Sequence, residues 1–203
     1  AALKHLGAPR ALVCAAGVLT LGPAAQYTDE QMQSVLEVCL LGTLRLVRGA
    51  LPRMIESGGG KVAVFSSING LMPTPFQGAY VAAKHALEGF SECLRLENRD
   101  KGIQVMLVEP GDHQGGAAKY RGRCRQTDPI YQESLNRVSA VIARDEAQGL
   151  PPAALGRRVA RALGRRRLPM RLRVASFSQR AAVVLHDILP GRLFLYLLSK
   201  YYK

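Results

Sequence analysis

Short, continuous apolar runs divide the first half of this chain at intervals. Residues 11–15 are apolar throughout and lie just before Gly17, as is typical of a strand buried on both faces of a parallel sheet. Similar runs occupy residues 61–65 and 103–108, and a Pro-Gly pair follows the last of them. We predict three parallel strands from these runs.

Between the runs, apolar residues recur at helical spacing. Thr28 and Gln31 have the spacing of a capping box, and the apolar positions after them repeat every three or four residues. Three glycines at 58–60 close this helical region, and a second helix is predicted for residues 80–97. Strands that alternate with helices pair in parallel through crossover helices. The sequence therefore predicts an α/β fold with a doubly wound, Rossmann-like parallel sheet, whose ligands bind at the carboxyl ends of the strands.

The pattern becomes looser after Gly111. We predict a polar loop at 112–127, helices at 131–147 and 152–163, a strand at 172–175 and a terminal helix from about residue 179. The 203 residues suffice for one domain, and no linker divides them. We expect residues 1–111 to form the sheet core with the active site, and residues 112–203 to supply a substrate loop and C-terminal helices.

The formal net charge of +13 would suit a nucleic acid or an anionic membrane as partner. Much of the excess lies in arginines between residues 157 and 173, which are interleaved with aliphatic rather than aromatic residues. Because no nucleic-acid recognition motif accompanies them, we interpret them as a solvated helix face and expect no nucleic-acid partner.

The sequence shows neither a targeting segment nor a metal-binding pattern. No run approaches the roughly 20 apolar residues of a membrane span, and residues 1–10 lack the pattern of a signal peptide. The four cysteines are widely spaced, without a Cys-x-x-Cys pair. We expect four reduced thiols, no metal site and a cytoplasmic location.

Candidate chemistry follows the second predicted strand. Ser67 stands thirteen residues before Tyr80, and Lys84 stands four residues after it on a predicted helix. This Ser…Tyr-x-x-x-Lys pattern, set between a buried strand and the sequence Glu109-Pro110-Gly111, resembles the short-chain dehydrogenase/reductase family over about residues 11–111. Because residues four apart share a helix face, we expect the ammonium of Lys84 to lower the pKa of the Tyr80 phenol, which is about 10 in the free side chain.

The resemblance implies a mechanism and a cofactor, NAD or NADP. In the family the tyrosine exchanges the proton, the serine steadies the substrate oxygen and the lysine also bonds the nicotinamide ribose, so we expect these roles of Tyr80, Ser67 and Lys84. Further cofactor contacts are implied for Ala15, Gly17, Pro110 and Gly111. The expected substrate is an apolar alcohol or ketone, because the chain looks most like the hydroxysteroid and retinol enzymes of the family.

Several positions depart from the family pattern. Ala15 replaces an asparagine that ties the central strands together, Cys39 replaces the helix asparagine of the proton relay, and Gly115 replaces a threonine that contacts the nicotinamide. The family's glycine-rich turn and first three strands should precede Ala1, so we expect an N-terminally truncated sheet without them. A catalytically inactive chain that keeps the fold as a binding or interaction protein is therefore an alternative to an active enzyme. The choice between NAD and NADP stays open.

Two expectations concern association. The family assembles through helices that correspond to about residues 28–54 and 80–97, so we expect a homo-oligomer. Residues 190–203 are apolar with basic and tyrosyl flanks, which suits peripheral contact with a membrane interface. Packing against the substrate region or another subunit explains the same pattern, and both interpretations stay open.

Overall fold

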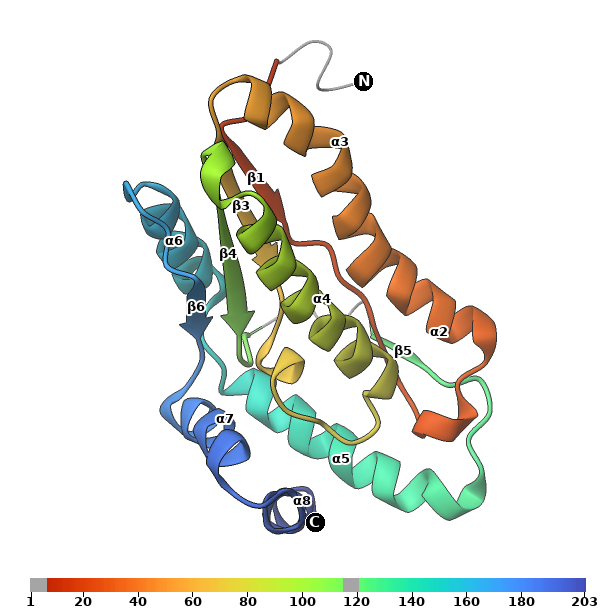
Figure 1. Ribbon diagram of the computed structural model, residues 1–203. Coiled ribbons are helices and arrows are strands. Elements are labelled where there is room, and N and C mark those ends of the chain that lie inside the picture. Colours follow the sequence, from red (N-terminus) through yellow and green to blue (C-terminus); the bar gives the residue numbers. More distant parts are fainter. Residues whose placement is uncertain (1–6, 115–120) are drawn as a thin grey trace.

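A four-stranded parallel sheet forms the centre of the molecule. The computed structural model describes residues 7–114 and 121–203, and helices cover both faces of the sheet (Figure 1). The strand order is β1-β3-β4-β6, and all three pairings are parallel, which confirms the predicted doubly wound α/β fold. The strands are β1 (Ala11–Cys14), β3 (Gly60–Phe65), β4 (Ile103–Pro110) and β6 (Arg171–Val174).

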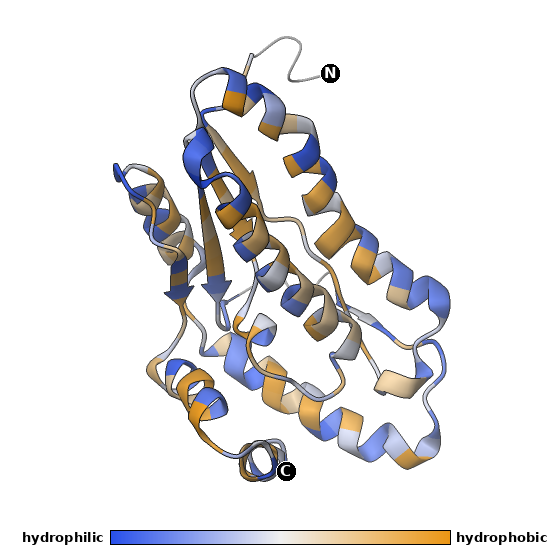
Figure 2. Ribbon diagram, in the orientation of Figure 1, coloured by the Kyte–Doolittle hydropathy of each residue, from blue (hydrophilic) through white to orange (hydrophobic). Residues whose placement is uncertain are grey.

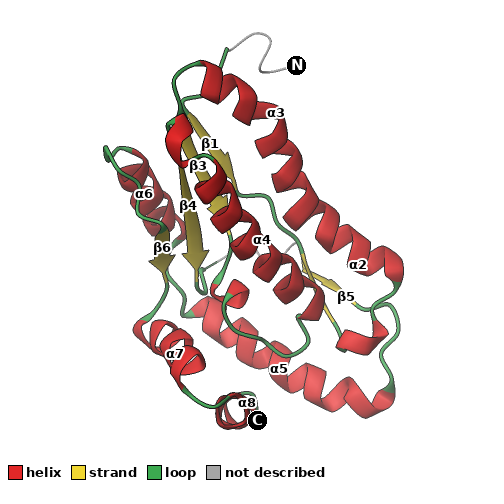
Figure 3. Ribbon diagram, viewed as in Figure 1, coloured by secondary structure: helices red, strands yellow, loops and turns green. Residues whose placement is uncertain are grey.

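The helices follow the strands in the predicted alternation (Figure 3). They are α2 (Asp29–Leu36), α3 (Gly42–Glu56), α4 (Gly78–Glu97), α5 (Pro129–Ala147), α6 (Pro152–Leu163), α7 (Phe177–Ile188) and α8 (Gly191–Tyr201), and a π-helical segment, Glu37–Leu41, joins α2 to α3. The capping box predicted at the start of α2 is confirmed. The Gln31 backbone N–H donates to the Thr28 hydroxyl at 3.3 Å, and the Thr28 N–H donates to the Gln31 side chain at 3.2 Å.

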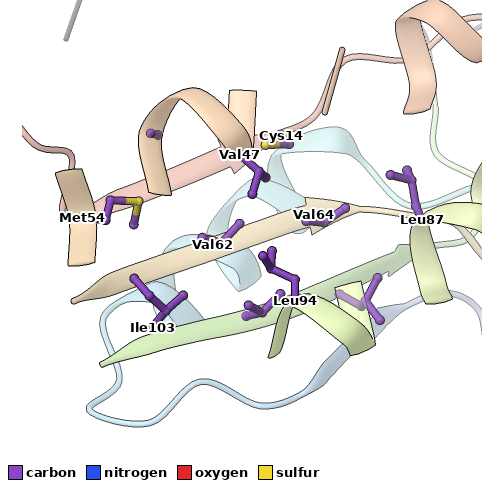
Figure 4. Close-up of a cluster of buried hydrophobic side chains, with 11 residues drawn as sticks. Cys14, Val47, Met54, Val62, Val64, Leu87, Leu94 and Ile103 are labelled. Carbon is purple, nitrogen blue, oxygen red and sulfur yellow. The ribbon is translucent and has the colours of Figure 1, made fainter. Parts of the chain in front are cut away.

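Alternate residues of the central strands enter different cores. Val62 and Val64 of β3 face α3 and α4, whereas Ala63 between them faces α6. Each fully buried valine or leucine contributes about 1.5–3 kcal/mol relative to an exposed one, so both layers hold the sheet in place. Figure 4 shows the first core, where side chains from the strands, α3 and α4 converge: Cys14, Val47, Met54, Val62, Val64, Leu87, Leu94 and Ile103.

The glycines at 58–60 end the first helical region, as predicted. Gly58 and Gly59 have φ angles of 88° and 111°, in the region that favours glycine. A Cβ on Gly59 would lie 2.3 Å from the carbonyl oxygen of Gly102, so no larger residue fits this turn into β3.

Two expectations for the C-terminal third are wrong. The polar loop at 112–127 contains a short strand, β5 (Arg121–Arg123), which pairs in parallel with β2 (Leu19–Leu21). The single terminal helix is two helices, because Pro190 has no N–H to continue α7 and holds Leu189 in an extended conformation with ψ of 148°.

Strand β1 lies at an edge of the sheet, and its Val13 side chain is 45% exposed. Within residues 7–114 and 121–203, no strand pairs with its outer edge. The absence of the family's first three strands stays a prediction.

Strand β6 forms the opposite edge and carries a buried ion cluster. Glu109 of β4 is fully buried and accepts hydrogen bonds from Arg171 and from Arg173, the latter at 2.7 Å. Arg171 also bonds Glu88 and Glu92 of α4. The intervening Leu172 packs on the other side, against the α6 core.

Candidate active site

A cavity of about 640 Å³ opens at the carboxyl ends of the strands, where the doubly wound sheet predicts a ligand. Segments after β1, β3 and β4 form one side of it, and α4, α5, α7 and α8 contribute most of the rest. The structure brings together at its wall all seven residues that the sequence assigned to catalysis or cofactor binding: Ala15, Gly17, Ser67, Tyr80, Lys84, Pro110 and Gly111.

Ser67 is held at the end of β3 by two hydrogen bonds. Its hydroxyl accepts from the Asn69 N–H at 3.1 Å and donates to the Pro110 carbonyl at 3.4 Å. Ser67 also acts on the phenol of Tyr80, in the direction that lowers its pKa. Both side chains line the same cavity.

Lys84 lies one turn beyond Tyr80 on α4 and is 97% buried, since its relative exposure is 3%. Its Nζ donates to the carbonyl oxygen of Phe65 at 2.6 Å and lies 5.3 Å from the centroid of the Tyr80 ring. Burial lowers the pKa of Lys84, while Cys39 and Glu88 act in the opposite direction.

The expected lowering of the Tyr80 pKa is wrong for the protein alone. Burial raises the pKa of Tyr80 to about 12, with a further contribution from the nearby Cys39, and only the hydrogen bond with Ser67 opposes it. The ammonium of Lys84 points to the Phe65 carbonyl, so desolvation of the phenol dominates.

The loop after β1 approaches Lys84 through glycine. A Cβ on Gly17 would lie 3.9 Å from Lys84 Nζ and 3.8 Å from Cys39 Sγ. Cys39 belongs to the π-helical segment and is fully buried. Its thiol makes two hydrogen bonds to Val18, the residue after Gly17: it accepts from the backbone N–H at 3.3 Å and donates to the carbonyl at 3.2 Å. The thiol therefore fixes this loop against the helices, whatever its part in proton transfer.

The sequence predicted Gly111 and a substrate loop after it, but not which residues of that loop line the cavity. A Cβ on Gly111 would lie 2.0 Å from Oε1 of Gln179, so the backbone passes directly beneath the start of α7. Asp112, the next residue, accepts a hydrogen bond from Gln179, and burial together with Asp145 and Glu146 raises its pKa to about 6. His113 donates through Nδ1 to the Gly111 carbonyl at 2.8 Å, and its buried Nε2 has no partner in the part of the chain that the structure describes.

No sequence signal assigned these residues to a site, although Asp112 and His113 directly follow the Pro-Gly pair. Position Gly115 lies outside the described residues, so its predicted relation to the nicotinamide is untested. Within the described ranges, no group of three or more His, Cys, Asp and Glu side chains is placed to hold a metal ion.

The residues suit the nicotinamide end of a dinucleotide. Lys84, Tyr80 and Ser67 offer a donor-rich wall, and Gly17 leaves the backbone next to Lys84 uncovered by a side chain. A glycine-rich turn between a strand and a helix, the usual pyrophosphate site, does not occur in residues 7–114 or 121–203.

Comparison with known proteins identifies the family. Residues 1–123 match the family model described as short chain dehydrogenase. The 3-ketodihydrosphingosine reductase of Bacteroides thetaiotaomicron is 31% identical over 202 residues, which are 98% of this chain and 75% of the relative. Human 17-beta-hydroxysteroid dehydrogenase type 1 is 41% identical over 100 residues, 49% of this chain and 30% of the relative. The chain thus spans only part of each relative's length.

Solved structures agree. A short-chain dehydrogenase from Streptomyces avermitilis superposes with a TM-score of 0.81 at 28% identity, over 98% of this chain and 72% of that one. The 4-hydroxyisoleucine dehydrogenase solved with NADH and succinate gives a TM-score of 0.52 at 33% identity, over 54% of this chain and 51% of that one. The chain therefore belongs to the short-chain dehydrogenase/reductase family, whose enzymes are oxidoreductases dependent on NAD or NADP.

Proposed function

We propose that this chain transfers hydride between NAD(P) and an apolar alcohol or ketone, with Tyr80 as the acid/base. One observation carries the proposal: Ser67, Tyr80 and Lys84 converge on the wall of a cavity at the carboxyl edge of the sheet. The bound cofactor supplies the hydride in reduction and accepts it in oxidation.

Ser67 and Tyr80 line the same cavity, and in this proposal both hydroxyls bind one substrate oxygen. In reduction, Tyr80 donates its proton to the carbonyl oxygen as that oxygen becomes a hydroxyl, and solvent returns a proton to Tyr80 afterwards. A pKa of about 12 keeps the phenol protonated at neutral pH, which is the form that this direction requires. Lys84, anchored on the Phe65 carbonyl, holds its remaining N–H donors toward the cavity for the cofactor ribose.

The cavity lining supports an apolar substrate. The two relatives are named for a ketodihydrosphingosine and a hydroxysteroid. Apolar side chains from α5, α7, α8 and the loop after β3 line the cavity: Met72, Ile142, Ala182, Leu185, Phe194, Leu197 and Leu198.

The test couples cofactor binding to turnover. The chain should bind NADH or NADPH in calorimetric titration and oxidise it in the presence of apolar ketones. Tyr80→Phe keeps the ring but has no proton to exchange, so it should bind the cofactor equally well and lose about 10²- to 10⁴-fold in kcat. If the variant turns over within a factor of a few of the parent, Tyr80 is not the acid/base.

A second function, a binding protein that keeps the fold, is favoured by the replacements at Ala15 and Cys39, since Cys39 is committed to Val18. A parent chain that binds cofactor without oxidising it on any ketone would support this second function.

A further inference from the structure

Exposed apolar side chains concentrate on the last two helices. Fifteen large hydrophobic residues are exposed in the described chain, and nine of them belong to α7 or α8. Both helices lie at the edge of the molecule, beyond the carboxyl ends of the strands, and are largely orange in Figure 2. The nine are Phe177, Val184, Leu185, Ile188, Leu193, Leu195, Tyr196, Leu197 and Tyr201, and we call them the α7–α8 surface.

Helix α8 carries Arg192, Ser199 and Lys200 on one side and apolar residues on the others, yet only Phe194 among its residues is buried. Leu193, Leu195 and Tyr196 are 45%, 54% and 57% exposed. The apolar face of an amphipathic helix is normally covered, and apolar residues gathered on a protein surface mark an interaction site.

The same helices form the wall of the active-site cavity. Leu185 of α7 and Leu197 of α8 both line the cavity and are exposed, at 41% and 46%. The α7–α8 surface therefore borders the cavity, where an apolar molecule can pass along it between the outside and the site.

The charges around this surface are basic. From Phe177 to the end of the chain there are four basic side chains, Arg180, Arg192, Lys200 and Lys203, against one acidic side chain, Asp187. Lys200 Nζ lies 5.3 Å from the ring centroid of Tyr196, so an ammonium and a phenol flank the exposed leucines. Tyrosine and lysine beside an apolar face suit the boundary between lipid headgroups and acyl chains.

We infer that the α7–α8 surface docks on an anionic lipid bilayer and that the substrate enters the cavity from the membrane. Docking is in the plane of the interface: α7 and α8 have 12 and 11 residues, and no helix in the described part of the chain is long and apolar enough to cross a membrane. The inference rests on the proposed function in one respect, namely that the cavity is the substrate site.

Sedimentation with vesicles tests the inference on the full chain. Binding should occur to phosphatidylcholine vesicles that contain phosphatidylserine, and should weaken on pure phosphatidylcholine and at high salt. Leu195→Asp should reduce the partition coefficient at least about tenfold, because it puts a charge in place of a leucine that docking buries among the acyl chains. Leu96→Asp is the matched control, since Leu96 is a 75% exposed leucine of α4, and it should bind as the parent does.

A charge variant tests whether the basic side chains contribute to binding of the anionic bilayer. Lys200→Glu should lose roughly tenfold in binding to phosphatidylserine vesicles and little on phosphatidylcholine. Equal binding by Leu195→Asp and Leu96→Asp, or no binding to anionic vesicles at low salt, would overturn the inference. A Leu195→Asp chain whose oligomeric state changes without any loss of vesicle binding would overturn it as well and assign the surface to a second copy.

Failure of the membrane inference is distinguishable from failure of the proposed function. Leu195 does not line the cavity, so Leu195→Asp should leave NAD(P)H binding and turnover of a small water-soluble ketone unchanged.

Discussion

Lys84 Nζ stands 5.3 Å from the centre of the Tyr80 ring, and Lys84 is buried while Tyr80 is half-buried at the cavity wall. Desolvation disfavours the charged form of each group, so the pKa of Tyr80 rises and the pKa of Lys84 falls. Burial therefore outweighs the electrostatic attraction between the phenol of Tyr80 and the ammonium of Lys84.

This balance predicts different pH profiles for the two directions of reaction. With a Tyr80 pKa of about 12, the protonated form dominates at and well above neutral pH, so kcat for ketone reduction should be flat from about pH 6 to 9. Alcohol oxidation needs the tyrosinate, and its rate should rise across the same range. Steady-state rates in both directions would check this, and an oxidation rate already constant above pH 7 would contradict it.

Asp112 gives a stability prediction. Its pKa is raised from 3.8 to about 6, so between these values the folded chain binds more protons than the unfolded one, and stability falls as pH rises from about 4 to 6. Asp112→Asn removes the free-energy cost of ionising a buried carboxyl, and its amide oxygen can still accept a hydrogen bond from Gln179. The free energy of unfolding should increase by about 1–2 kcal/mol at pH 7.5, less than full linkage because the side chain keeps some contact with water.

Urea denaturation at pH 7.5 and at pH 4 would measure the effect, which should vanish at the lower pH. Asp100→Asn, in an exposed turn, is the control and should change stability little. A destabilised Asp112→Asn chain at pH 7.5 would show that the charge is needed at this position.

The element most altered from a regular helix is the π-helical segment Glu37–Leu41. Such segments are uncommon and often lie at functional sites. Here the segment directs the thiol of Cys39 to both backbone groups of Val18, close to Lys84.

Cys39→Val should therefore destabilise the fold by about 0.5–1.5 kcal/mol, because the half-buried N–H and carbonyl of Val18 lose their partner. Cys39→Asn, whose amide has both a donor and an acceptor, should recover most of that loss. Thermal denaturation would compare the two with Cys93→Val, which changes an exposed cysteine. Equal melting temperatures for all three variants would show that the thiol bonds contribute nothing.

Elements were predictable where one local pattern decided them. The apolar runs of β1, β3 and β4 and the capping box of α2 are each complete within a few residues. Strands β2 and β5 are only three residues long, and they exist because distant segments meet, so no periodicity could reveal them. The break at Leu189 and Pro190 had a local signal, which the apolar character of the whole region obscured.

On the scale of the whole molecule, α3 and α4 cover one face of the sheet (Figure 1), and Leu46 of α3 is 51% exposed. The family resemblance leads us to predict self-association through these helices. Light scattering should detect a dimer or larger species, and Leu46→Arg should shift it toward the monomer. Ile130→Arg on α5 is the control, and a monomer at all concentrations would refute the prediction.

As with the elements, the residues of the site were predictable only where one local pattern related them. Ser67, Tyr80 and Lys84 lie within eighteen consecutive residues, so spacing alone could relate them. The opposite wall draws Ile142, Gln179 and Phe194 from three separate helices, and only the folded chain brings them to one cavity. Their apolar or amide side chains carry no motif that would assign them to a site.

The charges between β4 and β6 also bear on how the chain finds its final arrangement. Arg171 and Arg173 meet Glu109 on one face of the sheet, while Leu172 enters the apolar layer on the other. A shift of β6 by one position would send both arginines into that layer and leave a buried carboxylate alone, an error that costs several kcal/mol. The ion pairs therefore select the native register of β6 against a slip by one residue.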